Sequence, residues 1–115
     1  MNILLILKII ASLATAATGV LALVKPTAVY GFTGLIADGP RGISEIRAIF
    51  GGLFIALGVA PFIFGDAAYR VLGLGYLAIA LVRLVSIFLD KSTASSNWIS
   101  LAIEIVFGII LILRH

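Results

Sequence analysis

The stretch NWISLAIEIVFGIILILRH, residues 97–115, decides the fold. From Trp98 to Leu113 it is almost unbroken hydrocarbon, interrupted only by Ser100 and one acid, Glu104. A helix that crosses the hydrocarbon core of a bilayer needs about 20 predominantly apolar residues, and this segment approaches that length. It therefore predicts a membrane span. Inside a membrane, a carboxylate is unfavourable to bury and needs a partner or a proton.

The composition of the whole chain agrees with this prediction. Of its 115 residues, 63% are hydrophobic and 11% are charged. A soluble domain is about half apolar and about a quarter charged. We therefore expect an integral membrane protein that forms one domain over residues 1–115.

The charged and reactive residue types exclude several functions. The net charge is +3, but the bases are scattered singly near the predicted helix ends, which indicates anchoring at the membrane interface and not binding of nucleic acid. The chain has no cysteine, and its one histidine is the last residue, His115. Disulfides, thiolate chemistry and histidine ligation within the membrane are thereby excluded, and we expect no cofactor.

Three further apolar windows qualify as spans. Open strands are excluded because lipid cannot satisfy their backbone groups. We therefore predict an all-α four-helix bundle with up-down-up-down topology and both termini on the same side of the membrane. The predicted spans are residues 3–24, 43–64, 67–89 and 98–113.

Turn and cap residues support these boundaries. Gly65 is expected to end the second helix and Asp66 to cap the third. Pro61 is expected to kink or end the second helix. Ser96 or Asn97 is available as the cap of the fourth.

The first span is predicted to be an uncleaved helix and not a signal peptide. It has no basic region before its apolar run, and Lys8 interrupts that run. Lys8 lies about five residues from the start of the span, so we expect its ammonium group to reach the interface.

The two membrane faces carry different numbers of basic residues. Face A holds the N-terminus, the turn at residues 65–66 and the C-terminus, and face B holds the loops at residues 25–42 and 90–97. Three basic residues lie nearest face A (Lys8, Arg70, Arg114) and five nearest face B (Lys25, Arg41, Arg47, Arg83, Lys91). This small excess favours face B in the cytoplasm and leaves dual topology as an alternative.

Residue counting gives Glu104 a candidate partner. Glu104 lies six residues into the fourth span from Trp98, and Arg83 lies six residues before Leu89, where the third span reaches face B. Both are therefore roughly 9 Å below face B. Helices joined by a short loop pack as antiparallel neighbours, so we expect Arg83 and Glu104 to form an ion pair. Asp90 is an alternative partner for Arg83.

Two more charges lie near this depth on the second span. Glu45 and Arg47 follow Ile43 by two and four residues, and they point about 200° apart on a helix. Glu45 can simply favour the helix dipole, and Arg47 can reach the interface or serve as a second partner of Glu104. The candidate intramembrane polar network is therefore Glu45, Arg47, Arg83 and Glu104, whose charges sum to zero. The loop at residues 25–42 has an apolar core, AVYGFTGLI, so it is expected to lie in the interface or to fold back as a lid over this layer.

Three segments together resemble a known family: GISEIRAIFGGLFIALG (42–58), GYLAIALVRLVSIFLD (75–90) and ISLAIEIVFGIILI (99–112). They are similar to a bacterial family of small four-helix membrane proteins described as domain of unknown function 4345, which is loosely akin to DoxX-like membrane proteins. The residues that carry the resemblance are Glu45, Arg47, Gly51, Gly52, Arg83 and Glu104. The resemblance implies a four-helix bundle and no established reaction, and we expect the protein to lie in the bacterial inner membrane.

Two functional hypotheses follow. The first is a non-enzymatic accessory or scaffolding subunit, whose partners are other membrane proteins or a second copy of itself within the lipid bilayer. This hypothesis rests on the prediction of a compact apolar bundle and on the lack of an evident nucleophile in the sequence. The second is a carrier or binder of a small ion, lipid or quinone, in which Glu104 is the proton-sensitive group and Arg83 and Arg47 are its electrostatic partners.

Overall fold

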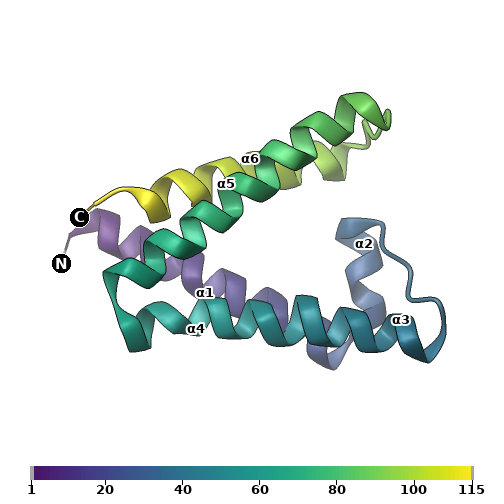
Figure 1. Ribbon diagram of the computed structural model, residues 1–115, viewed down its shortest axis with the longest axis horizontal. Helices are drawn as coiled ribbons and strands as arrows, with labels where there is room; N and C mark the ends of the chain where they lie inside the picture. Colours follow the sequence, from purple (N-terminus) through teal and green to yellow (C-terminus); the bar gives the residue numbers. More distant parts are fainter. Residues whose placement is uncertain (1, 115) are drawn as a thin grey trace.

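The computed structural model describes residues 2–114, and within that range every regular element is helical (Figure 1). The elements are α1 (Ile3–Val24), the 3₁₀ turn η1 (Pro26–Val29), α2 (Tyr30–Thr33), α3 (Gly39–Glu45), the π-helical segment η2 (Ile46–Leu53), α4 (Phe54–Phe64), α5 (Asp66–Leu89) and α6 (Ser95–Ile112). Because α3, η2 and α4 follow one another without a break, they form one helix from Gly39 to Phe64.

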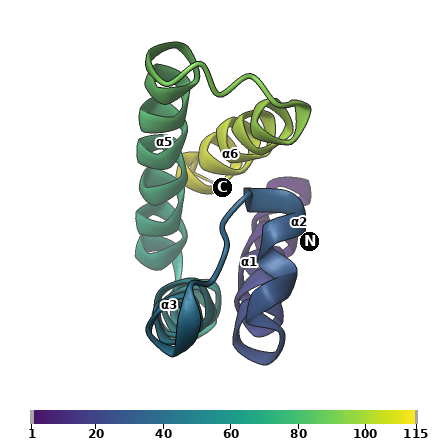
Figure 2. The same ribbon diagram turned by 90° about the vertical axis from the view of Figure 1, so that its right-hand side faces the viewer.

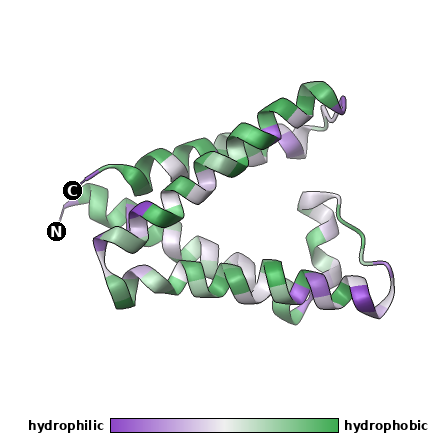
Figure 3. Ribbon diagram, in the orientation of Figure 1, coloured by the Kyte–Doolittle hydropathy of each residue, from purple (hydrophilic) through white to green (hydrophobic). Residues whose placement is uncertain are grey.

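Four helices are long and apolar enough to cross a membrane: Ile3–Val24, Gly39–Phe64, Asp66–Leu89 and Ser95–Ile112. Many of their large apolar side chains face outward, among them Phe88, which is 70% exposed. Figure 3 shows hydrophobic residues along the four long helices and hydrophilic ones concentrated at the loops and helix ends. An outward apolar surface of this extent suits lipid and not water. The structure thus confirms the predicted all-α fold of four long apolar helices.

The helices form two hairpins that diverge. In one hairpin α1 packs along η2 and α4, and in the other α5 packs along α6. The hairpins meet near the turn at Gly65, where both chain termini also lie, and they separate toward the opposite end (Figures 1 and 2). The short helix α2 stands at that open end and contacts α6. We keep the names face A for the end with the termini and face B for the open end.

Glycine allows the close packing within each hairpin. A Cβ atom on Gly58 would lie 2.6 Å from the backbone nitrogen of Ala16 and 2.7 Å from the carbonyl oxygen of Ser12, both on α1. A Cβ atom on Gly73 of α5 would lie 2.9 Å from the backbone nitrogen of Ile112 on α6. Small residues at such positions let helix backbones approach in membranes.

Two of the predicted helix caps are wrong. Asp66 is the first residue of α5, and Gly65 precedes the helix with a φ angle of 83°. The helix α6 begins at Ser95 after Ala94, and Asn97 lies inside it. Pro61 lies within α4, which ends three residues later at Phe64. The caps fail because a polar side chain near a helix start can bind a group on another element instead, as Asn97 does.

The prediction for Lys8 is also wrong, because its side chain does not reach the interface. Lys8 is 0% exposed. Its Nζ lies 3.6 Å from Oδ1 of Asp66 and 5.8 Å from the centre of the Tyr69 ring. The α4–α5 turn brings these two residues of α5 over the inward stripe of α1, so Lys8 finds its partners inside the bundle.

Candidate functional site

A two-point ion pair joins Arg83 on α5 to Glu104 on α6. Arg83 Nε donates a hydrogen bond to Oε1 of Glu104 at 2.7 Å, and Nη2 donates to Oε2 at 2.7 Å. The side chains are 31% and 11% exposed, respectively. A bidentate pair of this kind combines charge attraction with fixed geometry. Both carboxylate oxygens of Glu104 are therefore occupied by one guanidinium group.

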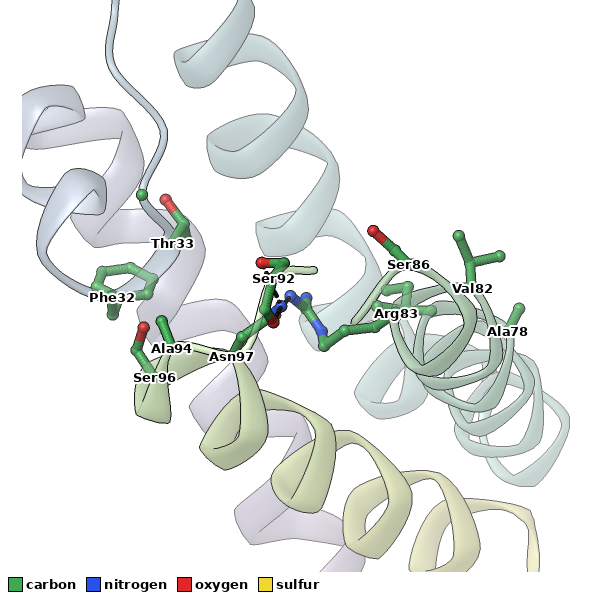
Figure 4. Close-up of a pocket in the computed structure, with 12 residues that line it drawn as sticks. Phe32, Thr33, Ala78, Val82, Arg83, Ser86, Ser92, Ala94, Ser96 and Asn97 are labelled. Carbon is green, nitrogen blue, oxygen red and sulfur yellow. Dashed lines mark hydrogen bonds between the residues drawn. The ribbon is translucent and has the colours of Figure 1, made fainter. Parts of the chain in front are cut away.

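Asn97 extends this pair toward face B. Its Oδ1 accepts a hydrogen bond from Nη1 of Arg83 at 2.8 Å. Its Nδ2 donates to the carbonyl oxygen of Ser92 at 3.0 Å and to Oγ of Ser92 at 2.9 Å. Figure 4 shows Arg83 reaching from α5 toward Asn97 and Ser92. The loop between α5 and α6 is thus tied to the ion pair through one amide side chain.

The spacing of these residues explains why they meet. Asn97 and Glu104 are seven residues apart on α6, which places them on one stripe about two turns from each other. Arg83 lies on the antiparallel neighbour α5, and its long side chain spans the distance between them. Asp90, the alternative partner of Arg83, instead accepts a hydrogen bond from Oγ of Ser86 at 2.6 Å.

Glu45 and Arg47 do not join Arg83 and Glu104. Glu45 is bound by Arg41 one turn earlier on α3, and both side chains are exposed. Arg47 lies exposed on η2, and its side chain has no hydrogen bond or ion pair with the residues from 2 to 114. The hairpins diverge toward face B, so a shared depth there does not bring the second span close to α5 and α6. The predicted four-residue network is therefore only half assembled.

A cleft of about 730 Å³ opens beside Arg83, between α2 and the α5–α6 hairpin. Its polar wall is formed by Arg83, Asn97 and hydroxyl side chains from α2, α5 and the α5–α6 loop, as Figure 4 shows. Its apolar wall includes Ala78, Ile79 and Val82 of α5. Phe32 and Thr33 of α2 face this space from the other side. The cleft therefore has a polar region and an apolar region within one volume.

Residue counting also places Asn97 near the depth of this pair, where it can add hydrogen bonds, but the sequence does not identify Arg83 and Ser92 as its partners. The other predicted role of Asn97, as a cap of α6, is not observed, because the side chain binds Arg83 and Ser92 instead. The expected lid segment forms η1 and α2, and Oγ1 of Thr33 donates to the carbonyl oxygen of Val29 at 2.6 Å. Its apolar sequence was the signal that it folds against the bundle.

A second, smaller cavity lies between the hairpins nearer their junction. It has a volume of about 180 Å³ and is lined by residues of α1, α4 and α5, including Thr15, Leu57 and Tyr76. The hydroxyl groups of Thr15 and Tyr76 are hydrogen-bonded to each other. Ile79 lines both this cavity and the larger cleft, so the two spaces adjoin along α5.

The polar groups of the cleft can form hydrogen bonds with a guest molecule. No group of three or more His, Cys, Asp or Glu side chains that could hold a metal occurs within residues 2–114. Arg83 makes three hydrogen bonds to Glu104 and Asn97, and a guanidinium group has further N–H donors beyond these. Arg83 can therefore donate to a guest molecule while remaining paired with Glu104.

Comparison with known proteins gives a family and no function. No curated protein and no solved structure matches the chain. The model of a family described as a domain of unknown function, DUF4345, matches residues 3–115. The match includes all four long helices and both halves of the Arg83–Glu104 pair. The chain therefore belongs to the DUF4345 family.

Proposed function

We propose that the protein binds a lipid-like amphiphile with an uncharged, hydrogen-bond-accepting head group in the cleft beside Arg83. The observation that carries this proposal is the composition of the cleft wall. Arg83 and Asn97 stand at one part of the wall, and Ala78, Ile79 and Val82 stand at another. An amphiphile has the same two parts, and small-molecule sites combine apolar walls with a few placed polar groups.

The pairing of Arg83 supports an uncharged head group. Glu104 already balances the charge of Arg83 through two hydrogen bonds. An anionic head group would lie close to that carboxylate and be repelled, whereas a carbonyl or hydroxyl oxygen needs only a free N–H group of Arg83. An ester, a quinone or an alcohol offers such an oxygen.

The apolar part of the guest would lie along α5. Val82 is 68% exposed and Ile79 is 39% exposed, so both are available to a hydrocarbon chain that enters from the bilayer. Ile79 also borders the smaller cavity, which extends the apolar surface toward the junction of the hairpins. A chain bound there would gain roughly 25 cal/mol for each Å² of apolar surface that it removes from water, and much less when it moves in from lipid. Head-group hydrogen bonds would therefore decide selectivity.

The cleft favours the binding hypothesis over the accessory-subunit hypothesis. An accessory subunit needs a surface complementary to another protein, whereas the cleft offers features that a small amphiphile can use. The role is proposed to be non-enzymatic, because both oxygens of Glu104 are held by Arg83 and neither is left as a free base. A bacterial inner membrane fits the proposal, because bacterial outer-membrane spans are β-barrels and these helices are not.

Binding can be tested with two single-chain lipids that differ by one phosphate group. The protein, purified in mild detergent, would be titrated with a monoacylglycerol and with the lysophosphatidic acid that carries the same acyl chain, and bound lipid would be counted by native mass spectrometry. We expect saturable binding of the monoacylglycerol and at least tenfold weaker binding of the lysophosphatidic acid. Equal binding of both, or binding of neither, would refute the proposal.

A plug in the cleft gives the matched control. Ala78 is exposed and lines the cleft, so Ala78→Trp fills the space without touching Arg83. Leu81 is 65% exposed on the same helix and lines none of the cavities described above, so Leu81→Trp adds the same side chain elsewhere. Ala78→Trp should weaken monoacylglycerol binding at least tenfold, and Leu81→Trp should leave it unchanged.

A further inference from the structure

The smaller cavity between the hairpins has mostly apolar walls. Phe54 and Leu57 line it from α4, and Leu72, Gly75 and Ile79 line it from α5. Its volume of about 180 Å³ is less than the roughly 300–1,000 Å³ of sites that hold a whole small molecule. The cavity therefore suits one part of a guest better than a complete ligand.

The two polar side chains that line this cavity offer no hydrogen to a guest. They are Thr15 of α1 and Tyr76 of α5. Oγ1 of Thr15 donates its one hydrogen to the carbonyl oxygen of Ala11 at 2.8 Å. In the Thr15–Tyr76 hydrogen bond Tyr76 is therefore the donor, so its hydrogen is also used. A head-group oxygen placed here would lack a donor, whereas a hydrocarbon group needs none.

The cavity and the large cleft lie end to end on one face of α5. Leu72, Gly75, Ile79, Val82 and Ser86 follow one another at spacings of three or four residues, which places them on a single stripe. The first three line the cavity, the last three line the cleft, and Ile79 belongs to both. Ile79 is 39% exposed, so the residue between the two spaces lies outside the buried core.

The length of this stripe matches an acyl chain of a membrane lipid. Arg83 and Leu72 are eleven residues apart on α5, which corresponds to about 16 Å along the helix. The hydrocarbon core of one leaflet is roughly 15 Å thick, half of a bilayer core of about 30 Å. A guest whose head group binds Arg83 therefore needs a full-length acyl chain to reach Leu72.

From this arrangement we propose that the small cavity receives the far end of the guest's acyl chain, so that the protein selects long-chain over short-chain neutral lipids. The inference rests on the proposed function and adds the class of guest to it. The head group decides which chemical class binds, and the cavity decides which chain length binds within that class. A short chain would leave the cavity empty, and the atoms that line an empty cavity lose the dispersion contacts that a longer chain would supply.

Two monoacylglycerols that differ in chain length test this inference. Monopalmitin and monocaprylin have the same head group, and the chain of monocaprylin is half as long and would end near Ile79. The full chain in mild detergent would be titrated with each lipid, and bound lipid would be counted by native mass spectrometry. We expect monopalmitin to bind at least fivefold more tightly than monocaprylin.

A plug in the cavity should remove this preference. A Cβ atom added at Gly75 would have no atom within 4 Å, so the ring of Gly75→Phe has space to occupy. Gly75→Phe should weaken monopalmitin at least fivefold and leave monocaprylin unchanged. Leu74 is 61% exposed and lines neither the cleft nor the cavity, so Leu74→Phe adds the same ring elsewhere and should keep the preference.

Photolabelling locates the chain end without any substitution. A monopalmitin analogue with a diazirine at the end of its chain, bound to the unchanged protein and irradiated, should label residues 54–57 of α4 or 71–76 of α5. Tyr76→Phe removes only a hydroxyl group that is already bonded, so both lipids should still bind it. Weakening of both lipids by Tyr76→Phe would show instead that the head group occupies the small cavity.

These measurements separate the inference from the function on which it rests. Equal binding of the two lipids, an unchanged preference in Gly75→Phe, or labelling confined to other residues would overturn the chain-length inference while binding in the cleft stands. Ala78→Trp lies in the cleft wall and should weaken both lipids. Binding of neither lipid by the unchanged protein would refute the proposed function and this inference together.

Discussion

At the scale of the residue, Glu104 is tolerated inside the bundle because a single guanidinium group occupies both of its oxygens. The pair contributes little net stability relative to apolar residues, since removing two charges from water is costly. What it provides is a strong dependence of each partner on the other. Loss of one partner leaves the charge of the other unpaired inside the bundle. Loss of both partners leaves no charge there.

This dependence predicts a double-mutant cycle. Arg83→Met should lower the free energy of unfolding by about 2–3 kcal/mol, because it leaves Glu104, whose side chain is 11% exposed, without its partner. Glu104→Met should cost somewhat less, because Arg83 is 31% exposed and reaches polar surroundings more easily. The double variant should lie within about 1 kcal/mol of the unchanged protein. Unfolding in mixed micelles would measure all four proteins. Additive losses in the double variant would show that the two side chains do not act as a pair.

Sequence reasoning reached the Arg83–Glu104 contact because both residues could be counted from a shared boundary on adjacent helices. It misplaced Lys8 for a related reason. A lysine near the end of a span usually reaches the interface. Whether it does so depends on what covers it, and here Asp66 and Tyr69 lie over it. Depth can be counted along one helix, whereas lateral neighbours require the packing.

At the scale of the element, the backbone contact between α1 and α4 limits what can replace Gly58. The nearest atoms to an added Cβ belong to the backbone of α1, which cannot rotate away as a side chain can. The helices must therefore separate by a few tenths of an ångström or more. In contrast, a Cβ added at Gly75 of α5 would have no atom within 4 Å.

These two glycines predict opposite effects of one substitution. Gly58→Ala should destabilise the protein by about 2 kcal/mol, within the range for overpacking of a tight contact. Gly75→Ala should stabilise it by about 0.5–1 kcal/mol, because alanine loses less backbone freedom than glycine in a helix. Thermal unfolding in detergent would compare both variants with the unchanged protein. A neutral Gly58→Ala would mean that α1 and α4 are not in backbone contact.

The direction of the helices could be predicted, but the angle between the hairpins could not. Hydropathy and turn residues locate the four long helices, whose observed bounds lie within four residues of the predicted ones. Periodicity shows which face of a helix is buried and not how far two helix pairs diverge. Glu45 and Arg47 were therefore assigned to the layer of Arg83 by depth alone, although the open end separates them. The cleft arises from the same divergence of the hairpins. The only feature of the sequence that pointed to it is the apolar segment that forms α2.

At the scale of the whole molecule, the excess of basic residues near face B predicts its orientation. Five lysines and arginines lie nearest face B and three nearest face A. Positive residues are retained in the cytoplasm, so both termini should lie outside it.

The absence of native cysteine makes this orientation directly measurable. A single cysteine at Thr93, exposed on the face B loop, should resist a membrane-impermeant maleimide in spheroplasts and react after lysis. A single cysteine at Ala67, exposed near face A, should react in both conditions. The reverse pattern would place face B outside, and half-labelling at both positions would indicate dual topology.

The position of α2 predicts how a guest reaches the polar part of the cleft. Phe32 of α2 and Ser96 of α6 both line the cleft and lie near each other at face B (Figure 4). A reducible bifunctional thiosulfonate that joins Phe32→Cys to Ser96→Cys would hold α2 against α6. If the head group passes α2 to reach Arg83, the joined protein should bind monoacylglycerol at least tenfold more weakly, and reduction should restore binding. The same double variant capped with a monofunctional thiosulfonate should bind normally, because it adds bulk without a tether. Full binding by the joined protein would show instead that the guest enters from the lipid side, along Val82 and Ile79.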